Sequence, residues 1–378
     1  MSKRVIISVI NDLATDQRVK RTALTFAEMG YNVILVGRRL PESLPVYNHP
    51  QIKPVRFKFW KNRGAVFYAL YTIRLFWYLL FKRADILYAN DLDTLLPNFA
   101  IAKLKNIPLI YDSHEYFTGV PELKNNRFAK SVWLTVERFI FPKLQHIITV
   151  NESISELYFR LYNQKPVVVR NVPITQVKLG VDKESVKNKY ALPLDENVFI
   201  LQGSGINIQR GAEEAIEAMQ WVEAKLLIVG GGDVFAMLPE LAQRFKVQHK
   251  IIIHPKVKQE ELRKITSVCF AGLTLDKSTN INYRLSLPNK LFDYIHAGIP
   301  VIASRLPEVE AIVMDYEVGI VLSDFRAETV AAGMNRMLGN KEEYNLFSKN
   351  CKRAAEELCW EKEKEKLISV ISSAVKNN

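Results

Sequence analysis

Three titratable side chains stand together directly after an apolar segment at residues 107–111. They are Asp112, His114 and Glu115, separated only by Ser113. Residues 107–111 are predicted to form a buried strand, and open α/β sheets bind ligands at the carboxyl ends of such strands. We therefore predict that Asp112, His114 and Glu115 are catalytic residues, with His114 as the strongest candidate. The alternative is a structural histidine that caps a loop.

A second candidate site lies in the stretch 286–308, where a loop turns into a helix. Pro288 fits the first helical position, Gly298 fits a left-handed cap, and residues 301–303 read as a short buried strand. A helix start offers free backbone N–H groups and a positive dipole end, which suit a phosphate or a sugar hydroxyl. Asp293 lies just over one turn inside and could accept hydrogen bonds from a ribose diol. The alternative is a β-loop-α-loop-β unit whose carboxylate is only solvated.

A glycine-bearing turn provides a third candidate. Gly203-Ser204-Gly205 follows a predicted strand at residues 197–202 and precedes a predicted helix at residues 212–219. Such a turn lets the backbone approach a diphosphate, and Arg210 could neutralise the charge. A Gly-x-Gly pair alone is weak evidence, but its position between a strand and a helix strengthens it. The later glycine run at residues 230–232 fits a nucleotide-binding turn or a flexible turn equally well.

Three segments together resemble retaining glycosyltransferase family 4, whose members have the GT-B fold. The donor-site motif of that family is Glu-x7-Glu followed by a small-Gly-x-Pro-Val-x-Ala-Ser run. Asp293 stands at the second glutamate, and residues 297–304 match the run. The group at residues 112–115 resembles the segment whose histidine approaches the donor sugar, and Arg210-Gly211 matches a base that precedes a glycine.

The chain also departs from the family pattern. Leu285 replaces the first glutamate and cannot bind a sugar hydroxyl. The backbone amides of Leu287 and Asn289, or the side chain of Asn289, would then supply this contact. Ser204 stands where the family has a second base, and the first loop, residues 11–16, lacks the usual glycines.

The resemblance implies an α/β chain with the GT-B fold, in which two doubly wound parallel-sheet domains face an interdomain cleft. We expect residues 1–172 to form an acceptor-side domain, on which a C-terminal helix at residues 360–378 packs back. Residues 173–359 would form the nucleotide-sugar-binding domain. The glycine-bearing turn at residues 203–205 and the loop-to-helix stretch at residues 286–308 both fall in this second domain.

The implied activity is retaining transfer of a hexosyl group from a nucleotide sugar to a hydroxyl acceptor, in polysaccharide, lipopolysaccharide or glycolipid synthesis. We expect UDP rather than GDP as the nucleotide, and no metal ion or other cofactor. Asp293 would bind the ribose, Arg210 and Lys290 the diphosphate, and the amides near Leu287 the charge of the leaving group. The full predicted nucleotide-binding set is Gly203, Arg210, Leu287, Asn289, Lys290 and Asp293.

Two other functions remain open from the sequence. One is a nucleotide-sugar epimerase of the same fold, which would act without an acceptor. The other is a non-catalytic nucleotide-sugar-binding protein, which Leu285 and the glycine-free first loop leave open. A nucleic-acid binder is disfavoured, since the basic residues flank an apolar aromatic run and no reader motif occurs.

Charge is distributed unevenly along the chain, whose net charge is +12. Residues 1–168 carry 24 Lys and Arg against 13 Asp and Glu, a balance of +11, and the remainder carries 28 against 27. This asymmetry indicates an anionic partner for the N-terminal half. The three cysteines, which have no metal-ligand spacing, indicate a reducing cytoplasm.

An apolar aromatic run at residues 65–81 lies in an interval without acidic residues, between Glu42 and Asp85. Its 17 residues contain Arg74 and fall short of the about 20 that a spanning helix needs. The run fits a helix in a membrane interface or a buried helix of the first domain. We therefore expect a cytoplasmic protein that binds the inner face of the plasma membrane peripherally, to reach a lipid-linked acceptor.

Two local patterns in the first half carry further expectations. A helix from Gln17 should be capped by Thr15 or Asp16, and its Arg18 and Arg21 would either reach a phosphate or line a solvated face. A later pair, Ser153 and Glu156, has the spacing of a capping box.

Overall fold

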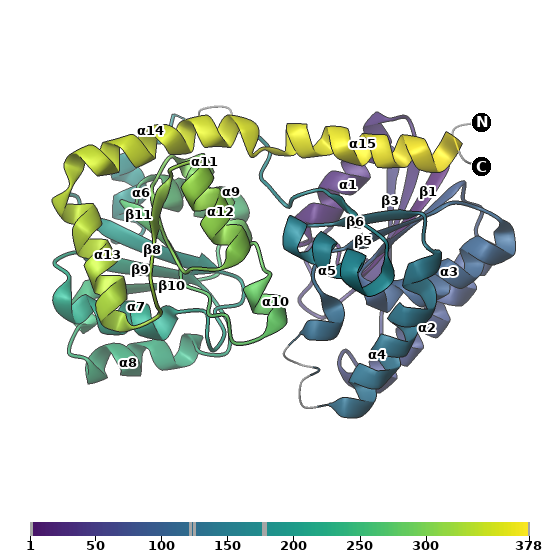
Figure 1. Ribbon diagram of the computed structural model, residues 1–378, viewed down its shortest axis with the longest axis horizontal. Helices are drawn as coiled ribbons and strands as arrows, with labels where there is room; N and C mark the ends of the chain where they lie inside the picture. The colour runs from purple at the N-terminus through teal and green to yellow at the C-terminus, as the bar shows by residue number, and fades with distance from the viewer. Residues whose placement is uncertain (1–2, 121–122, 124–125, 176–179, 377–378) are drawn as a thin grey trace. The chain divides into compact units, whose positions relative to one another are not determined.

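The computed structural model describes residues 3–120, 123, 126–175 and 180–376 (Figure 1). The chain divides into two units, which we describe separately. The N-terminal unit comprises Met1–Asn171 and Glu363–Asn378, and the C-terminal unit comprises Val172–Lys362. The second division falls inside the last helix, α15 (Trp360–Lys376), and the final two residues predicted for this helix, 377–378, lie outside the described residues.

The described residues of the N-terminal unit form a seven-stranded sheet in the order β3-β2-β1-β4-β5-β6-β7, with every neighbouring pair parallel. Its strands are β1 (Arg4–Asp12), β2 (Asn32–Arg38), β3 (Ile52–Phe57), β4 (Ile86–Asn90), β5 (Leu109–Ser113), β6 (His146–Thr149) and β7 (Val167–Val168). Continuous apolar runs make β4 and β5 fully buried, as parallel strands covered on both faces must be.

Helices form the connections between these parallel strands except that from β2 to β3, where residues 39–51 contain no helix. They are α1 (Gln17–Glu28), α2 (Gly64–Phe81), α3 (Leu92–Lys105), α4 (Arg127–Ile140) and α5 (Glu152–Tyr162), with short 3₁₀ turns η1 (Phe117–Gly119) and η3 (Phe141–Lys143). Asp16 caps α1, as expected, by accepting a hydrogen bond from the Val19 amide. The capping box predicted at Ser153 and Glu156 is wrong, because Asn151, two residues before Ser153, caps α5 through its side chain.

The C-terminal unit has a parallel six-stranded sheet among its described residues, in the order β10-β9-β8-β11-β12-β13. Its strands are β8 (Val198–Gly203), β9 (Lys225–Gly230), β10 (Ile251–Pro255), β11 (Ala271–Thr274), β12 (Val301–Ala303) and β13 (Gly319–Val321). Two apolar cores lie in this unit, one centred on Phe199 and Leu226 and the other on Ile200 and Leu227. Alternate residues of β8 and β9 therefore belong to different cores, which the period-2 alternation of strand side chains explains.

The helices of this unit include the predicted helix at the loop-to-helix stretch. They are α6 (Lys183–Lys189), α7 (Ala212–Ala218), α8 (Leu238–Arg244), α9 (Gln259–Ser267), α10 (Ile281–Arg284), α11 (Asn289–Ala297), α12 (Pro307–Asp315), α13 (Ala327–Gly339) and α14 (Lys341–Glu357), with 3₁₀ turns η4 (Met219–Trp221), η5 (Phe235–Met237) and η6 (Gln248–Lys250). Gly298 ends α11 in the left-handed conformation, at φ 72°, as predicted. Pro288 is the N-cap rather than the first helical residue, because its ψ of 136° is extended.

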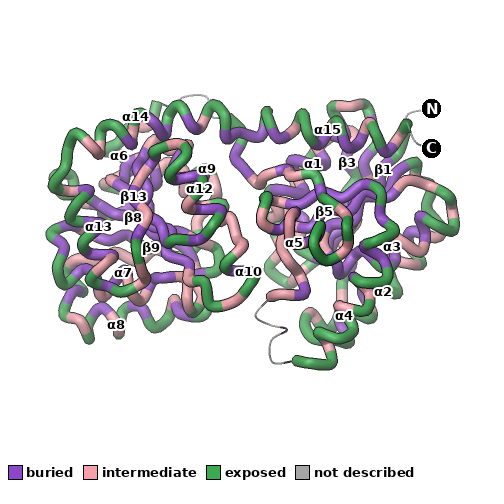
Figure 2. Tube along the Cα trace, in the orientation of Figure 1, coloured by how far each residue is buried: buried purple, intermediate pink, exposed green. Residues whose placement is uncertain are grey.

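Each sheet reverses its strand order once, at β1 and β4 in one unit and at β8 and β11 in the other. The segments that leave such neighbouring strands diverge, and ligands bind in the resulting crevice at the carboxyl ends of the strands. Figure 2 shows the central strands of each sheet as buried and much of the surrounding helices as exposed. The loops after these four strands are therefore where functional side chains are expected.

Candidate active site

Asp112, at the carboxyl end of β5, is held by two other buried side chains of the N-terminal unit. The Arg18 guanidinium binds it in a fork, with Nε 3.0 Å from Oδ2 and Nη2 2.7 Å from Oδ1, and the Tyr88 hydroxyl donates to Oδ2 at 2.8 Å. The side chains of Arg18 and Asp112 are only 3% and 1% exposed. Burial alone would raise the pKa of Asp112, but attraction to Arg18 and His114 holds that pKa well below its usual range. Asp112 is thus a fixed negative charge under neutral conditions.

The His114 ring lies between two carboxylates. Its Nδ1 is 3.3 Å from Asp91 Oδ2, and its Nε2 is 3.5 Å from Asp112 Oδ2 and 3.1 Å from Asn90 Oδ1. The His114 backbone N–H also donates to Asp91 Oδ1, at 2.8 Å. Asp91 adopts φ 58° and ψ 167° at the turn between β4 and α3, a strained backbone conformation that residues other than glycine rarely adopt. The ring is therefore fixed in orientation by partners from two neighbouring strands.

These contacts determine the protonation state of His114. Burial by itself would lower the pKa of His114, but the carboxylates of Asp91 and Asp112 outweigh it and raise the pKa to about 9. The side chain is therefore an imidazolium near pH 7, which donates hydrogen bonds and positive charge. It is unsuited to accept a proton as a general base. Glu115 follows in the same loop, half-buried, and its backbone carbonyl accepts a hydrogen bond from the Ser113 hydroxyl at 2.8 Å.

The structure gives Arg18 and Arg21 structural bonds inside the N-terminal unit. Both are buried in the N-terminal unit, so they do not line a solvated face. Arg18 donates to the Val169 carbonyl at 2.7 Å in addition to binding Asp112, and Arg21 binds the side chain of Asn171. These bonds occupy all three nitrogens of the Arg18 guanidinium, so Arg18 is not a phosphate ligand, and both arginines hold residues 169–171 against α1.

The C-terminal helix α15 contributes to the same region. Figure 1 shows α15 beside α1, where Lys364 pairs with Glu28. Glu363 is buried and accepts a hydrogen bond from the Arg170 backbone N–H at 2.9 Å. Arg170 follows Val169, whose carbonyl binds Arg18. The last helix therefore supports the segment that positions Arg18 and, through it, Asp112.

The ion pairs of His114 predict a pH dependence of stability. Its pKa is about 9 in the folded protein and near 6.5 when unpaired, so the contribution is fully present below about pH 6.5 and is lost as the pH rises through 9. The total amounts to about 3 kcal/mol at most. The free energy of unfolding of wild type minus that of His114→Asn should therefore fall between pH 6.5 and 9.5 in urea denaturation. A difference that is constant across this range would contradict the placement of the ring between charged carboxylates.

In the C-terminal unit, one buried carboxylate brings Arg210 and Lys290 together. Asp276, in the loop after β11, is fully buried, with Arg210 Nη1 2.8 Å from Oδ1 and Lys290 Nζ 3.2 Å from Oδ2. Burial alone would raise the pKa of Asp276, but Lys290 and Arg210 lower it. The Arg210 guanidinium also lies over the Tyr283 ring, 4.1 Å from its centroid. The trio has a net charge of +1, and both cations keep partly exposed faces.

The start of α11 presents unpaired backbone donors beside this trio. Within the described part of the chain, the N–H groups of Leu287, Asn289 and Lys290 have no hydrogen-bond partner. Leu291 is the first residue of the helix whose N–H is bonded, to the Pro288 carbonyl at 3.1 Å. Because Lys290 belongs to both groups, the unpaired amides and the side-chain cations lie together. Such a set suits an anion with several oxygen atoms, such as a diphosphate.

Asp293 lies one turn further along α11 and is half-buried. Gln202, at the end of β8, donates to Asp293 Oδ2 at 3.0 Å and accepts from the Thr266 hydroxyl at 2.7 Å. This chain fixes the amide orientation of Gln202 and therefore the position of the Asp293 carboxylate. A fixed carboxylate near an anion site can accept hydrogen bonds from a ribose diol.

Gly203, the last residue of β8, approaches the glycine run at residues 230–232 closely. A Cβ at Gly230, whose φ is 152°, would lie 1.8 Å from the Gly203 carbonyl oxygen. A Cβ at Gly232 would similarly lie 2.4 Å from the carbonyl oxygen of Ile206. Gly230 and Gly232 are therefore required for close packing between the two loops.

Sequence reasoning missed Asp276 and Gln202. Asp276 comes two residues after β11, which ends at Thr274, and so has the same position relative to its strand that drew attention to Asp112. The signal was available, since a carboxylate at the carboxyl end of a predicted parallel strand is a candidate ligand-site residue. Gln202 has no comparable signal, because an amide inside an apolar strand is compatible with many structural roles.

Comparisons with known proteins agree with this architecture. Residues 16–184 match the family model described as Glycosyltransferase Family 4, and residues 182–354 match the model described as Glycosyl transferases group 1. The chain is 24% identical to a chitobiosyldiphosphodolichol beta-mannosyltransferase of Candida glabrata over 86% of this chain and 81% of that protein.

Solved structures share the fold at low identity. Sucrose-phosphate synthase from Thermosynechococcus elongatus superposes with a TM-score of 0.81 at 16% identity, over 100% of both chains. Anabaena HepE in complex with UDP superposes with a TM-score of 0.74 at 12% identity, over 98% of this chain and 100% of that one. The two parallel-sheet units thus define a GT-B protein. Together with the family matches, this shows that the chain belongs to the family 4 type of GT-B glycosyltransferases.

Proposed function

We propose that this glycosyltransferase moves a hexosyl group from a nucleotide sugar, with UDP favoured over GDP, to a hydroxyl acceptor with retention and without a metal ion. The observation that carries the proposal is the anion site at the start of α11. There Arg210 and Lys290 share the buried Asp276, next to the unpaired amides of Leu287 and Asn289. This set can bind a diphosphate through cations and amides alone.

In the proposed reaction, the bond between the anomeric carbon and the diphosphate oxygen breaks as the acceptor oxygen bonds to that carbon from the same face. The acceptor proton passes to the departing phosphate oxygen. Negative charge grows on the diphosphate as it leaves, so donors fixed beforehand at Arg210, Lys290 and the α11 amides favour the transition state over the ground state. Asp293 would hold the ribose and Gly203 would line the nucleotide site.

The N-terminal unit would supply the acceptor side and His114. As an imidazolium fixed by Asp91 and Asp112, His114 is suited to contact the transferred sugar and orient it for departure. Asp112 acts through His114, since its own oxygens are occupied by Arg18 and Tyr88. Glu115 belongs to the proposed catalytic set by its place in the same loop.

We infer a lipid-linked acceptor for this enzyme. The name of the Candida relative specifies a diphosphodolichol-linked acceptor, and the uneven positive charge of the first 168 residues suits an anionic lipid partner. We accordingly propose a cytoplasmic enzyme of polysaccharide, lipopolysaccharide or glycolipid synthesis. The anomeric configuration of the new glycosidic bond tests retention, because a retaining enzyme must convert an α-linked donor into an α-linked product.

Nucleotide binding by variants of the C-terminal unit tests the donor site. Each charge-assisted hydrogen bond removed from a buried site costs about 1.5–3 kcal/mol. Arg210→Ala and Asp293→Ala should therefore each raise the Kd for UDP roughly ten- to hundredfold in calorimetric titrations, measured with EDTA present. Arg336→Ala is the matched control, since Arg336 pairs with Glu343 on the surface of the same unit. If both site variants bind UDP and GDP as the wild type does, the diphosphate lies elsewhere.

A further inference from the structure

Helix α2 is apolar on the side that faces water as well as on the side that faces the protein. Its inner side buries Phe67, Tyr71, Leu75 and Leu79 at four-residue spacing. The opposite stripe, exposed along the whole helix, consists of Ala65, Ala69, Ile73, Trp77 and Phe81. A surface helix of a water-soluble domain normally carries polar residues on its outer side. The outer side of α2 therefore lacks the chemistry expected of a surface in contact only with water.

Arg74, the one charged residue within α2, does not make this outer side polar. Its guanidinium lies over the Phe57 ring, 4.6 Å from the centroid, and donates to the Lys58 carbonyl at 3.0 Å. Two of the largest outer side chains, Trp77 and Phe81, are 53% and 77% exposed and stack on each other with centroids 6.0 Å apart. The outer stripe is thus a continuous apolar surface with an aromatic end.

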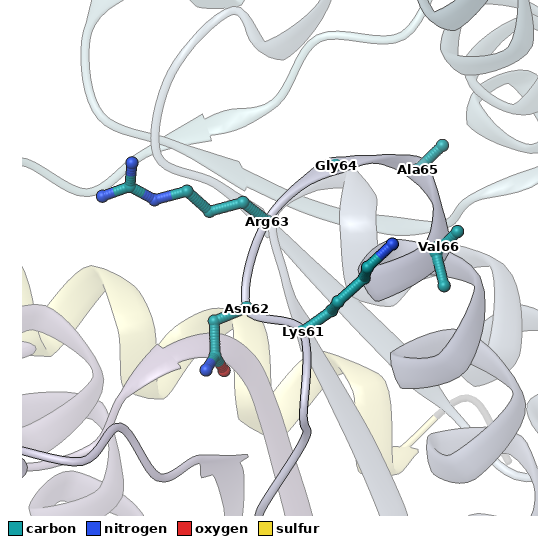
Figure 3. A pocket seen from close by; sticks show the side chains of 6 residues that line it. All are labelled: Lys61, Asn62, Arg63, Gly64, Ala65 and Val66. Carbon is teal, nitrogen blue, oxygen red and sulfur yellow. The ribbon is translucent and has the colours of Figure 1, made fainter.

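Exposed basic residues flank both ends of α2. Lys61 and Arg63 precede the helix, and Lys82 and Arg83 follow it. Residues 61–63 and the first turn of α2, residues 64–66, line an open pocket of about 470 Å³. Figure 3 shows the side chains of Lys61 and Arg63 extending from this segment. Trp60, next to this loop, is 81% exposed. No acidic residue occurs between Glu42 and Asp85, so nothing in this interval offsets the positive charge.

The neighbouring helix α4 extends the exposed apolar and basic surface of α2. Trp133 of α4 contacts Tyr68 of α2, with ring centroids 5.5 Å apart. The exposed residues of α4 and the following turn include the apolar Phe128, Val132 and Phe139, the basic Arg127, Lys130, Arg138 and Lys143, and the uncharged Ser131 and Thr135. Glu137, its one acidic residue, is buried and accepts a hydrogen bond from the Tyr162 hydroxyl at 2.6 Å. The exposed side chains of α4 therefore carry no negative charge.

The apolar outer stripe of α2 and its flanking basic residues favour a lipid surface over a protein partner. Among the described residues, α2 is the one helix long and apolar enough to cross a membrane, but its inner stripe packs within its own unit. Protein interfaces are depleted in lysine, whereas an apolar stripe with aromatic residues and flanking Lys and Arg is typical of helices that lie in an anionic membrane interface. We propose that the outer stripe of α2, with its flanking basic residues and α4, docks the N-terminal unit on an anionic bilayer.

Vesicle sedimentation of the full-length protein tests this proposal, which does not depend on the transfer reaction. Vesicles of phosphatidylcholine with about one third phosphatidylglycerol should sediment the protein, and vesicles of phosphatidylcholine alone should sediment much less. Added salt should release the protein, because screening weakens the attraction between the basic residues and the lipid headgroups. No donor or acceptor is present, so the outcome is separate from the proposed enzymatic activity.

Two variants localise the binding. Each basic residue near an anionic surface contributes roughly fivefold to affinity, so Lys61→Gln, Arg63→Gln and Lys82→Gln together should lower vesicle affinity about a hundredfold. The matched control, Lys341→Gln with Lys349→Gln and Arg353→Gln, removes the same charge from exposed positions of the C-terminal unit and should bind as the wild type does. Trp77→Ser with Phe81→Ser should also weaken binding, whereas Trp221→Ser with Met237→Ser should not.

Three results would overturn the proposal. The first is equal recovery of the protein with neutral and anionic vesicles. The second is an equal loss of vesicle affinity in the variant at Lys61, Arg63 and Lys82 and in the control variant at Lys341, Lys349 and Arg353. The third is wild-type vesicle affinity in the variant at Lys61, Arg63 and Lys82. Circular dichroism and UDP binding establish whether each variant is folded. If the Trp77 and Phe81 variant fails to fold, the two variants with three basic residues replaced still test the proposal, because they change only exposed polar side chains.

Discussion

The Arg18→Met variant is expected to unfold with a free energy about 3–5 kcal/mol lower than that of the wild type. The substitution keeps an unbranched side chain but leaves the Asp112 carboxylate buried without its bidentate cation. It also removes the bond from Arg18 to the Val169 carbonyl. A buried charge without its partner retains its full desolvation penalty, which is why the loss exceeds that of a surface ion pair.

Urea denaturation followed by circular dichroism measures this change. Arg160→Met is the control, because Arg160 is exposed on α5 in the same unit, and it should change the free energy of unfolding by less than about 0.5 kcal/mol. Adding Asp112→Asn to Arg18→Met should restore part of the loss, since the uncompensated charge is then removed. Equal stabilities of Arg18→Met and Arg160→Met would show that the buried pair is not formed.

The His114→Ala variant is expected to lose at least about a hundredfold in kcat, the usual effect of removing one preorganised donor from an active site. The imidazolium is fixed by Asp91 and Asp112, so it needs no reorganisation to present its charge to the substrate. Binding of UDP alone should change little, because the residues proposed to hold the diphosphate belong to the C-terminal unit. The loss should therefore appear in turnover and not in the nucleotide Kd.

Steady-state release of nucleoside diphosphate, compared with calorimetric UDP titrations, separates the two quantities. His249→Ala is the control, because His249 is exposed in the C-terminal unit, and it should leave both unchanged. Asp112→Asn should also reduce kcat, since Asp112 acts by holding the His114 ring. A folded His114→Ala enzyme with wild-type kcat would assign His114 a structural role only.

Local signals in the sequence were sufficient for much of the fold. The strand that precedes Asp112, the cap at Asp16 and the left-handed end of α11 at Gly298 each depend on residues close together in the chain. The two doubly wound parallel sheets and the division into two units followed from the resemblance to a family. The cap at Asn151 was missed because Ser153 and Glu156 offered a competing capping pattern two residues later.

The candidate site was less predictable because its contacts join distant residues. Arg18 and Asp112 are 94 positions apart, and Arg210 and Asp276 are 66 apart. No periodicity or spacing rule connects such pairs, so Arg18 was interpreted as a phosphate ligand or a solvated residue, and Asp276 was overlooked. Parallel strands bring these residues together only after the whole sheet has formed.

The most direct test of the account is a transfer assay with EDTA present, using UDP- and GDP-linked hexoses as donors. The acceptors are a set of lipid-diphosphate-linked sugars and a set of soluble glycosides. We predict stoichiometric release of nucleoside diphosphate, an acceptor heavier by one hexosyl group, and an anomeric configuration in the product that matches the donor by NMR. Conversion of the donor to an epimeric nucleotide sugar without an acceptor, or donor binding without release of nucleoside diphosphate with either acceptor set, would contradict the account.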